Sequence, residues 1–371
     1  MKETVLSVTV LVLLLLTVSI TAFVLPVRAV RTWTVDDDGP ADFQKIKEAI
    51  DAASDGDTVF VYSGTYSKAL SIDKRISLIG QNPLTTIIDV DEELWIAIRI
   101  RTDNVVISGF TVRDTAGLYG SGCGGIMIIG SSGCLIENCV VIDNQYGINL
   151  CGSSNNSIAN NRISWNWAMG IQVMPSDSIY SNNNLIKGNW IVNNTDIPDT
   201  QIEDPQIGVG IWSYCNNNTI TENVFCNNSL IMDDNTTGNA VYRNNFMNQT
   251  EVKIYPPYNV TWSKDGEGNF WINYTGVDED ENGVGDAPYI IGTGSIDYYP
   301  LMNLWVPPIL ITDLNDDGAT NILDVTIVAV AYNSTPQDPN WNQTADVNKD
   351  ELINILDVAK VAMEFGKTRV G

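Results

Sequence analysis

The chain has 371 residues, of which 44% are hydrophobic and 18% charged, so it is long enough for two domains and too apolar for a disordered acidic tail. Its 45 Asp and Glu residues against 20 Lys and Arg residues give a net charge of −25, which disfavours nucleic-acid binding because few cations can neutralise phosphates. The chain has no histidine, which excludes Ser-His-Asp and Cys-His catalysis and His-ligated zinc or copper. The acidity instead suits calcium held by oxygen ligands.

An apolar stretch from Val5 to Leu25 opens the chain, and the small residues around Ala29 are typical of a signal-peptidase site. We interpret residues 1–29 as a cleaved export signal. The alternative is an uncleaved membrane anchor, because the stretch approaches the ~20 residues that span a bilayer. Either interpretation predicts a secreted or cell-surface protein that touches the membrane only through this segment. Ten Asn-X-Ser/Thr sequons between Asn155 and Asn342 agree with that location.

The segment from Asp42 to Ala53 has helical spacing of its apolar residues, and Thr58 to Tyr62 has the composition of a strand. This run precedes a repetitive region. Because a solenoid needs its open end covered, we expect the helix to cap the first coil.

A short pattern then recurs, consisting of an apolar residue, a polar residue, Gly or Asn, a second apolar residue and Asn a few positions later. Successive copies start 21 to 34 residues apart, a spacing typical of solenoids. Short β-type runs separated by Asn and Gly predict a right-handed parallel β-helix with about 22 residues per coil. Asn at the corners tolerates the left-handed conformation and can bond the backbone, so stacked Asn residues should form a ladder. The copies begin at Ile107, Ile136, Ile158, Ile186, Ile220 and Val241.

Cysteines are sparse for a chain of this length, and six of them permit fifteen complete disulfide pairings in an oxidising compartment. Cys139 occupies the repeat position held elsewhere by Asn161, Asn189 and Asn223. We therefore expect Cys139 to be an inward, stacked free thiol. The six residues are Cys123, Cys134, Cys139, Cys151, Cys215 and Cys226.

The stretch from Phe43 to Tyr66 and the segment Ile76-Ser77-Leu78-Ile79-Gly80 resemble the entry of pectate-lyase-like β-helix proteins. More narrowly, they resemble the NosD-type group of carbohydrate-binding proteins and sugar hydrolases. The stretch from Gly268 to Leu301 is similar to the closing segment of that group. The resemblance covers residues 33–303 and implies the fold, whereas the group's activities include lyases, hydrolases, epimerases and non-enzymes. The copper role of NosD does not carry over to a chain without histidine.

Two acidic twelve-residue loops lie near the end of the chain, at 313–324 and, 33 residues later, at 346–357. Alternating side-chain oxygens at positions 1, 3, 5, 9 and 12 can point at one calcium ion. Gly318 stands at the sharp turn of the first loop, whereas Glu351 replaces it in the second, where strain is expected. Short apolar helices are expected at 325–332 and 358–365. The oxygen-bearing residues are Asp313, Asn315, Asp317, Asn321 and Asp324, then Asp346, Asn348, Asp350, Asn354 and Asp357.

These two half-motifs resemble a dockerin domain at 313–367, joined to the β-helix by a linker at 304–312. The resemblance implies two calcium ions and docking onto a cohesin module of another protein. The residues before each final Asp are apolar, and we expect them to contact the partner. A generic calcium-stabilised module without a cohesin partner is the alternative. The predicted partner-binding residues are Ile322, Leu323, Ile355 and Leu356.

A third acidic loop at 278–286 has the same opening spacing, with oxygen ligands expected from Asp278, Asp280, Asn282 and Asp286. Its twelfth position is Tyr289, so the motif is incomplete. The loop is either a third calcium site or an acidic surface turn.

Three functions fit this sequence, and we favour a surface β-helix that binds or processes polysaccharide and is delivered by its dockerin. Trp165, Trp167, Trp190 and Trp212 fall at or near repeat positions, and aromatic faces suit sugar rings. The second function is catalysis, as a lyase, hydrolase or uronate epimerase. The third is a non-catalytic structural spacer with a calcium-binding docking module.

A lyase would need calcium with a Lys or Arg base, whereas a hydrolase would need two carboxylates ~5–9.5 Å apart. The sequence carries no catalytic signature of a known family. The weak catalytic candidates on or near the repeats are Asp143, Asp177, Asp196, Asp199, Glu203, Asp204 and Lys187.

Overall fold

The structure is a computed structural model. It describes residues 29–90, 96–113, 124–194, 206–248, 250–257, 259–292, 294–306, 312, 314 and 320–365. The predicted export signal therefore lies outside the described residues, apart from Ala29. Among the described helices, none is both long enough and apolar enough to cross a bilayer.

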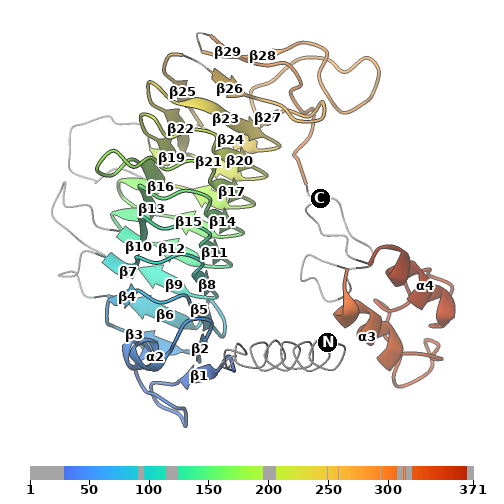
Figure 1. The fold of residues 1–371 in the computed structure, drawn as a ribbon. Coiled ribbons are helices and arrows are strands. Elements are labelled where there is room, and N and C mark those ends of the chain that lie inside the picture. Colours follow the sequence, from blue (N-terminus) through green and yellow to red (C-terminus); the bar gives the residue numbers. More distant parts are fainter. Residues whose placement is uncertain are drawn as a thin grey trace, which may run out of the picture.

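Three parallel sheets wind into a right-handed β-helix (Figure 1), which confirms the predicted fold. Each coil contributes one strand to each sheet in turn. The ten-stranded sheet A consists of β1 (Thr32–Val35), β2 (Thr58–Val61), β5 (Ser77–Gly80), β8 (Val106–Ser108), β11 (Leu135–Glu137), β14 (Ser157–Ala159), β17 (Leu185–Lys187), β20 (Thr219–Thr221), β23 (Thr237–Tyr242) and β26 (Asn259–Thr261).

The other two sheets complete each coil. The nine-stranded sheet B consists of β3 (Gly64–Tyr66), β6 (Thr86–Asp89), β9 (Thr111–Arg113), β12 (Val140–Ile142), β15 (Arg162–Ser164), β18 (Trp190–Val192), β21 (Val224–Cys226), β24 (Asn245–Met247) and β27 (Phe270–Trp271). The eight-stranded sheet C consists of β4 (Leu70–Ile72), β7 (Ile96–Ile100), β10 (Gly124–Ile129), β13 (Tyr146–Cys151), β16 (Met169–Met174), β19 (Ile207–Ile211), β22 (Ser229–Met232) and β25 (Val252–Ile254).

The interior of the β-helix is a set of stacked apolar columns, because the strands are in register and alternate residues point inward. The first residue of every repeat copy, from Ile107 to Val241, has no exposed surface. A second column changes to aromatic residues at its C-terminal end. There Phe225, Phe246, Trp271 and Tyr289 stack with ring centroids 5.0, 4.3 and 4.5 Å apart. The hairpin of β28 (Tyr289–Ile291) and β29 (Ser295–Asp297) supplies the last ring.

Asparagine ladders join the coils at all three corners, one corner more than the repeat pattern of the sequence includes. In each ladder the buried Oδ1 accepts from the backbone N–H and the Nδ2 of the Asn one coil earlier. Cys139 occupies the first rung of one ladder and donates its N–H to Asn161 Oδ1 at 3.0 Å, so the predicted stacked free thiol is confirmed. The rungs are Cys139, Asn161, Asn189, Asn223, Asn244 and Asn269 between sheets A and B; Asn144, Asn166, Asn194 and Asn228 between B and C; and Cys134, Asn156, Asn184, Asn218 and Asn239 between C and A.

Every rung except Asn269 follows a residue in the left-handed region, which turns the backbone from one sheet to the next. Asn160 precedes Asn161 with φ 55°, and Gly188 precedes Asn189 with φ 65°. Asn and Gly adopt this conformation at the lowest cost, which explains their recurrence in the sequence. The ladder between sheets A and B ends on the buried carboxylate of Asp297, which accepts from the N–H of Asn269 and from Trp271 Nε1.

A helix precedes the coils as predicted, but it begins four residues later than its spacing indicates. Helix α2 spans Ile46–Ala52 and buries Ile46, Ala49 and Ile50. Asp42 instead accepts the N–H and hydroxyl hydrogen bonds of Thr34, and Phe43 pairs with Val35, so these residues pair with β1 and do not join the helix. The role of α2 as a cap remains a prediction.

The C-terminal module has its own small core, separate from the columns of the β-helix. Helix α3 spans Ile322–Val330 and helix α4 spans Ile355–Met363. Val328 on α3 and Val361 on α4 are fully buried between them. Both helices begin where the acidic loops end, three residues earlier than predicted, because Asn321 and Asn354 act as N-caps.

The ladder predicts a large cost for removing one internal rung. Asn189→Ala would leave the N–H of Asn161 and the carbonyl of Ile158 without their amide partners inside the core. We expect the free energy of unfolding to fall by about 2–4 kcal/mol, because each unpaired buried polar group costs about 1–3 kcal/mol. Denaturant unfolding measures this. Asn259→Ala on the exposed position of β26 is the matched control, and equal losses in both variants would contradict the prediction.

Candidate functional site

Three carboxylates of the second acidic loop converge, as the sequence predicts for a metal centre. The closest oxygens of Asp346, Asp350 and Asp357 all lie within 4.8 Å of one another. Asp346 and Asp357 are buried, whereas Asp350 is exposed. Three carboxylates at this distance repel one another unless a cation lies between them, and oxygen donors of this kind suit a hard cation such as calcium.

The backbone of this loop is folded around its own side chains. Asp346 accepts the N–H groups of Asp350 and Glu351 at 3.1 and 3.0 Å. Asp357 accepts the N–H of Asn348 at 3.1 Å and that of Asn354 at 2.9 Å, the second being half of the capping box of α4. Each carboxylate retains free lone pairs after these bonds, so the loop is organised without using up its ligand atoms.

The turn of the second loop is strained, as the missing glycine predicts. Glu351 has φ 65° and Lys349 has φ 61°. A residue with a Cβ pays about 1–2 kcal/mol for this conformation. The loop therefore carries a backbone cost at position 6 that glycine would remove.

The first loop is described only at its end. Asp324 accepts the N–H of Asn321 at 2.7 Å and that of Leu314 at 2.6 Å, and Asn321 accepts the N–H of Leu323. This repeats the capping box of the second loop. The predicted ligands Asp313, Asn315 and Asp317 lie outside the described residues.

The third acidic loop has the hydrogen-bond pattern of the second. Asp278 accepts the N–H groups of Asn282 and Gly283 at 3.1 and 2.8 Å, as Asp346 does at the same loop positions. Asn282 accepts from Val284, as Asp350 does from Leu352. Positions 4 and 6 are left-handed in both loops. The ninth position, Asp286, accepts the N–H of Glu279 at 2.7 Å.

The predicted partner-binding residues are all exposed. Ile322 and Leu323 begin α3 and are 63% and 54% exposed, and their counterparts in α4 are 61% and 58% exposed. The same duplication extends along both helices, because Val330 and Met363, also 33 residues apart, are exposed as well. The module therefore shows the same apolar residues twice, once on each helix.

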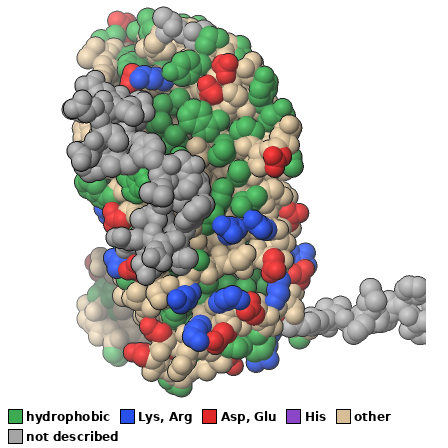
Figure 2. Space-filling model, turned by 90° about the vertical axis from the view of Figure 1, so that its left-hand side faces the viewer, with side chains coloured by type: hydrophobic (Ala, Val, Ile, Leu, Met, Phe, Trp, Pro, Cys, Tyr) green, Lys and Arg blue, Asp and Glu red, His purple; other side chains and the backbone are tan. Residues whose placement is uncertain are grey.

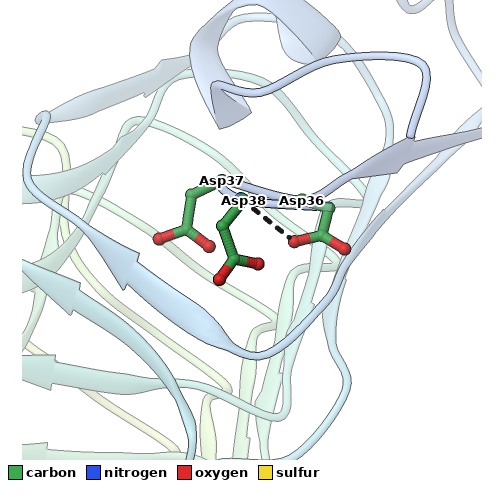
Figure 3. Close-up of side chains that lie close together, drawn as sticks. All are labelled: Asp36, Asp37 and Asp38. Atoms are coloured by element: carbon green, nitrogen blue, oxygen red, sulfur yellow. Dashed lines mark hydrogen bonds between the residues drawn. The ribbon is translucent and has the colours of Figure 1, made fainter. Parts of the chain in front are cut away.

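A second cluster of carboxylates lies near the start of the β-helix and was not predicted from the sequence. Asp36, Asp37 and Asp38 follow β1 and approach one another as the dockerin carboxylates do (Figure 3). Asp36 accepts the N–H of Asp38 at 3.4 Å, and Asp37 accepts that of Thr65 at 3.3 Å. The run Asp-Asp-Asp was the available signal, but consecutive residues lack the alternate spacing of a calcium loop.

The weak catalytic candidates do not assemble into one site among the described residues. Asp143 lies at a corner between sheets B and C, whereas Asp177 lies in a turn between sheets C and A; both are exposed and left-handed. Asp143 occupies the corner position that Asn193 holds in another coil. The other carboxylate candidates, Asp196, Asp199, Glu203 and Asp204, lie outside the described residues.

Lys187, the basic residue among these candidates, lies in a largely buried ion pair. It pairs with Glu222 at 3.4 Å, and their side chains are only 13% and 10% exposed. Burial lowers the pKa of Lys187 and raises the pKa of Glu222, and the attraction between the two charges opposes both shifts. Sequence reasoning missed Glu222, whose only signal was a charged residue at a corner usually held by Asn or Gly.

Of the four tryptophans expected on the surface, two are exposed. Trp165 is 51% and Trp190 is 55% exposed, whereas Trp167 and Trp212 are partly buried. Figure 2 shows the side of the β-helix formed by sheet C, where hydrophobic side chains gather over the C-terminal coils and Lys and Arg over the N-terminal coils.

Two family models match the chain. The model described as periplasmic copper-binding protein (NosD) matches residues 50–276, about three fifths of the chain, and the dockerin type I domain model matches residues 311–365. Among curated proteins, a cell surface glycoprotein of Methanothermus fervidus is 27% identical over 62% of this chain and 51% of its own length. The chain thus spans about half of that relative. A probable ABC transporter binding protein NosD of Stutzerimonas stutzeri is 37% identical over 19% of this chain and 17% of its own.

Among solved structures, an alginate lyase from Paenibacillus is 15% identical, with a TM-score of 0.41 over 63% of this chain and 98% of its own. Pectate lyase Pel9A is 13% identical, with a TM-score of 0.41 over 68% of this chain and 83% of its own. Both are similar to the β-helix portion at a level that carries no inference about activity.

The residues present do not fit the copper named in the family description. The chain has no histidine, and the described cysteines are all free, with four of the five buried. Burial raises the pKa of Cys139 to about 12 and that of Cys215 to about 11, so both remain thiols, whereas copper binds thiolates. Cys151 and Met174 are cross-strand neighbours, but two soft donors fall short of a copper ligand set.

The strained turn predicts how the second loop responds to substitution. Glu351→Gly should raise calcium affinity about fivefold, because releasing roughly 1 kcal/mol of backbone strain favours the loop that binds. Titration calorimetry of the full chain measures this. Glu351→Gln is the matched control, since it removes the charge and keeps the strain, and it should not raise affinity. A gain in Glu351→Gln equal to that in Glu351→Gly would refute the strain explanation.

Proposed function

The chain belongs to the NosD family, and on that premise we propose that it is an exported surface protein whose β-helix binds polysaccharide and whose dockerin domain attaches it to a cohesin module of a partner protein. The observation that carries this proposal is the second dockerin loop. Its three converging carboxylates lead directly into an exposed apolar pair at the start of α4.

Calcium is the ion we propose for the dockerin loops. Asp346, Asn348, Asp350 and Asp357 would hold it in the second loop, with Asn354 at position 9. Their predicted counterparts in the first loop have the same alternate spacing. Calcium would neutralise the carboxylates at the foot of each helix and so fix the direction in which the helix presents its apolar residues.

The two helices offer two similar docking surfaces. Ile322 and Leu323 on α3 correspond to Ile355 and Leu356 on α4, and an exposed apolar pair of this kind costs solubility unless a partner covers it. We propose that a cohesin module covers one pair at a time. Substitution of one pair would then weaken docking less than substitution of both.

Location and module boundaries follow the same proposal. The Methanothermus fervidus relative is named a cell surface glycoprotein, which supports a secreted or surface location. We propose that residues 1–29 direct export, that 33–303 form the β-helix unit, and that 304–312 link it to the dockerin at 313–367. The separate buried clusters support this division.

Binding of polysaccharide is favoured over turnover. The described carboxylate candidates Asp143 and Asp177 lie at different corners, so they do not form the pair that a hydrolase needs. Exposed Trp165 and Trp190 offer faces for sugar rings. The β-helix is therefore proposed to hold a glycan while the dockerin sets its location.

Removing calcium is expected to destabilise the dockerin and to leave the β-helix folded. Chelation should abolish docking to immobilised type I cohesin modules and remove the dockerin transition in a calorimetric scan of the full chain, because the loop carboxylates then repel one another. The β-helix transition should persist, since apolar columns and Asn ladders, and not metal ligands, hold its coils together. Unchanged transitions and unchanged docking would contradict the proposal.

Surface substitutions provide the control for this experiment. The double variant Leu323→Asp with Leu356→Asp should abolish docking while calcium affinity stays within twofold, because these side chains are exposed and are not ligands. Ile290→Asp, an exposed apolar residue of β28, should leave docking unchanged. Loss of docking in the Ile290 variant would show that the effect is not specific to the dockerin helices.

The third loop predicts a third bound ion. Its first half matches the second loop bond for bond, and we propose that Asp278, Asp280, Asn282 and Asp286 bind calcium there. Equilibrium dialysis should find three ions per chain, and two in the variant Asp278→Asn with Asp280→Asn. Asp36→Asn is the matched control, because it changes a carboxylate of the other acidic cluster, and it should leave the count at three. A count of two in the unmodified chain would make the loop an acidic surface turn.

A further inference from the structure

A groove of about 710 Å³ lies at the C-terminal end of the corner between sheets A and B. It is formed where β20 and β23 end and where the closing segment of the β-helix folds back against them. Its walls include Glu222, Arg243, Lys264, Glu267, Val284 and Trp305. It is distinct from the dockerin loops and from the outer face of sheet C.

Both signs of charge line this groove: Arg243 and Lys264 lie among the carboxylates of Glu222, Asp265 and Glu267, and Arg243 also lies 3.9 Å from Asp265. Arg243 bonds Glu267 through Nε at 2.6 Å, and Lys187 pairs with Glu222. Lys264 is exposed and forms no ion pair with any carboxylate of the described residues. Its ammonium lies 5.7 Å from the ring of Tyr242, which also carries the guanidinium of Arg243 at 5.8 Å. The exposed ammonium of Lys264 can therefore pair with an anionic group of a ligand.

Two charged residues of the groove adopt a backbone conformation that is unfavourable for residues with a Cβ. Glu222 has φ 62° and Arg243 has φ 57°. Other coils fill this corner position with Gly109, Asn138 or Gly188, which adopt the conformation more cheaply. Non-glycine residues in this region concentrate at functional sites, and here two successive coils point side chains of opposite charge into one groove.

An aromatic wall completes the groove. Trp305 is partly buried, and Asn245 fixes its backbone by accepting its N–H at 2.8 Å and donating to its carbonyl at 2.9 Å. The neighbouring Leu304 is 47% exposed. An indole beside charged donors and acceptors is a combination that binds sugar rings.

We propose that this groove binds a uronate-bearing segment of a polysaccharide. Lys264 and Arg243 would face the sugar carboxylate, the carboxylates of Glu222 and Glu267 would accept hydrogen bonds from hydroxyl groups, and the ring would lie against Trp305. A neutral sugar would offer the ammonium of Lys264 no direct ion pair. The inference rests on the proposed polysaccharide function and adds to it the site and the substrate class.

The test is titration calorimetry of the full chain at fixed ionic strength with saturating calcium, because Asn282 and Val284, which line the groove, belong to the proposed third calcium loop. The probes are tetramers of galacturonate, mannuronate and glucuronate, each with its carboxyl-reduced counterpart. At least one acidic tetramer should bind about tenfold more tightly than its reduced form, a difference that one charge-assisted hydrogen bond can supply.

Two variants and one control locate the site. Lys264→Gln should weaken the acidic tetramer about tenfold and leave the reduced one unchanged, whereas Trp305→Ala should weaken both. Lys253→Gln is the matched control, because this lysine lies on β25 of sheet C and pairs with Glu251. Its affinity should stay within twofold of the unmodified chain.

The remaining outcomes distinguish failure of the uronate groove from failure of the proposed polysaccharide function. Equal binding of acidic and reduced tetramers, or binding unaffected by Lys264→Gln and Trp305→Ala, would overturn the uronate groove and leave polysaccharide binding at another face. Failure of the unmodified chain to bind any tetramer overturns the uronate groove. If it also fails to bind polymeric glycans, acidic and neutral, the polysaccharide part of the proposed function falls with it.

Discussion

The buried asparagine amide is the interaction on which the rest of this β-helix depends. A coil of short strands must turn three times, and each turn leaves backbone groups inside the core that strand pairing does not satisfy. An Asn side chain satisfies them, because its Oδ1 accepts from the preceding coil and its Nδ2 donates to a strand carbonyl and to the next Asn. The ladders therefore fix the register of the coils as firmly as the apolar columns do.

The same corners are positions at which charged side chains can replace Asn or Gly. A left-handed residue precedes every rung except Asn269, and its side chain is not itself a rung, so it can change without removing one. Most coils use Asn or Gly there, but Glu222 and Arg243 replace them in two successive coils. Because consecutive coils are adjacent in space and distant in sequence, this substitution brings Lys187, Glu222 and Arg243 to one edge of the solenoid.

The dockerin is organised by its charged loops more than by packing of its core. Its loops wrap backbone N–H groups around carboxylates that would repel one another in the absence of a cation. The helices bury a core of only a few residues, so the module depends on its loops for rigidity. The β-helix, with a continuous core, does not share this dependence.

The sequence by itself determined the β-helix, the inward thiol at Cys139, the two dockerin half-motifs and their apolar pairs, because each is encoded in local spacing. It placed the helix at Asp42 and missed its true start at Ile46, since the pairing of Asp42 and Phe43 with β1 is non-local. It also missed the Asn ladder between sheets C and A and the cluster of Lys187, Glu222, Arg243 and Lys264. Only the tertiary structure decided these, because the number of inserted residues between strands varies from coil to coil, and proximity across coils depends on register and not on sequence distance.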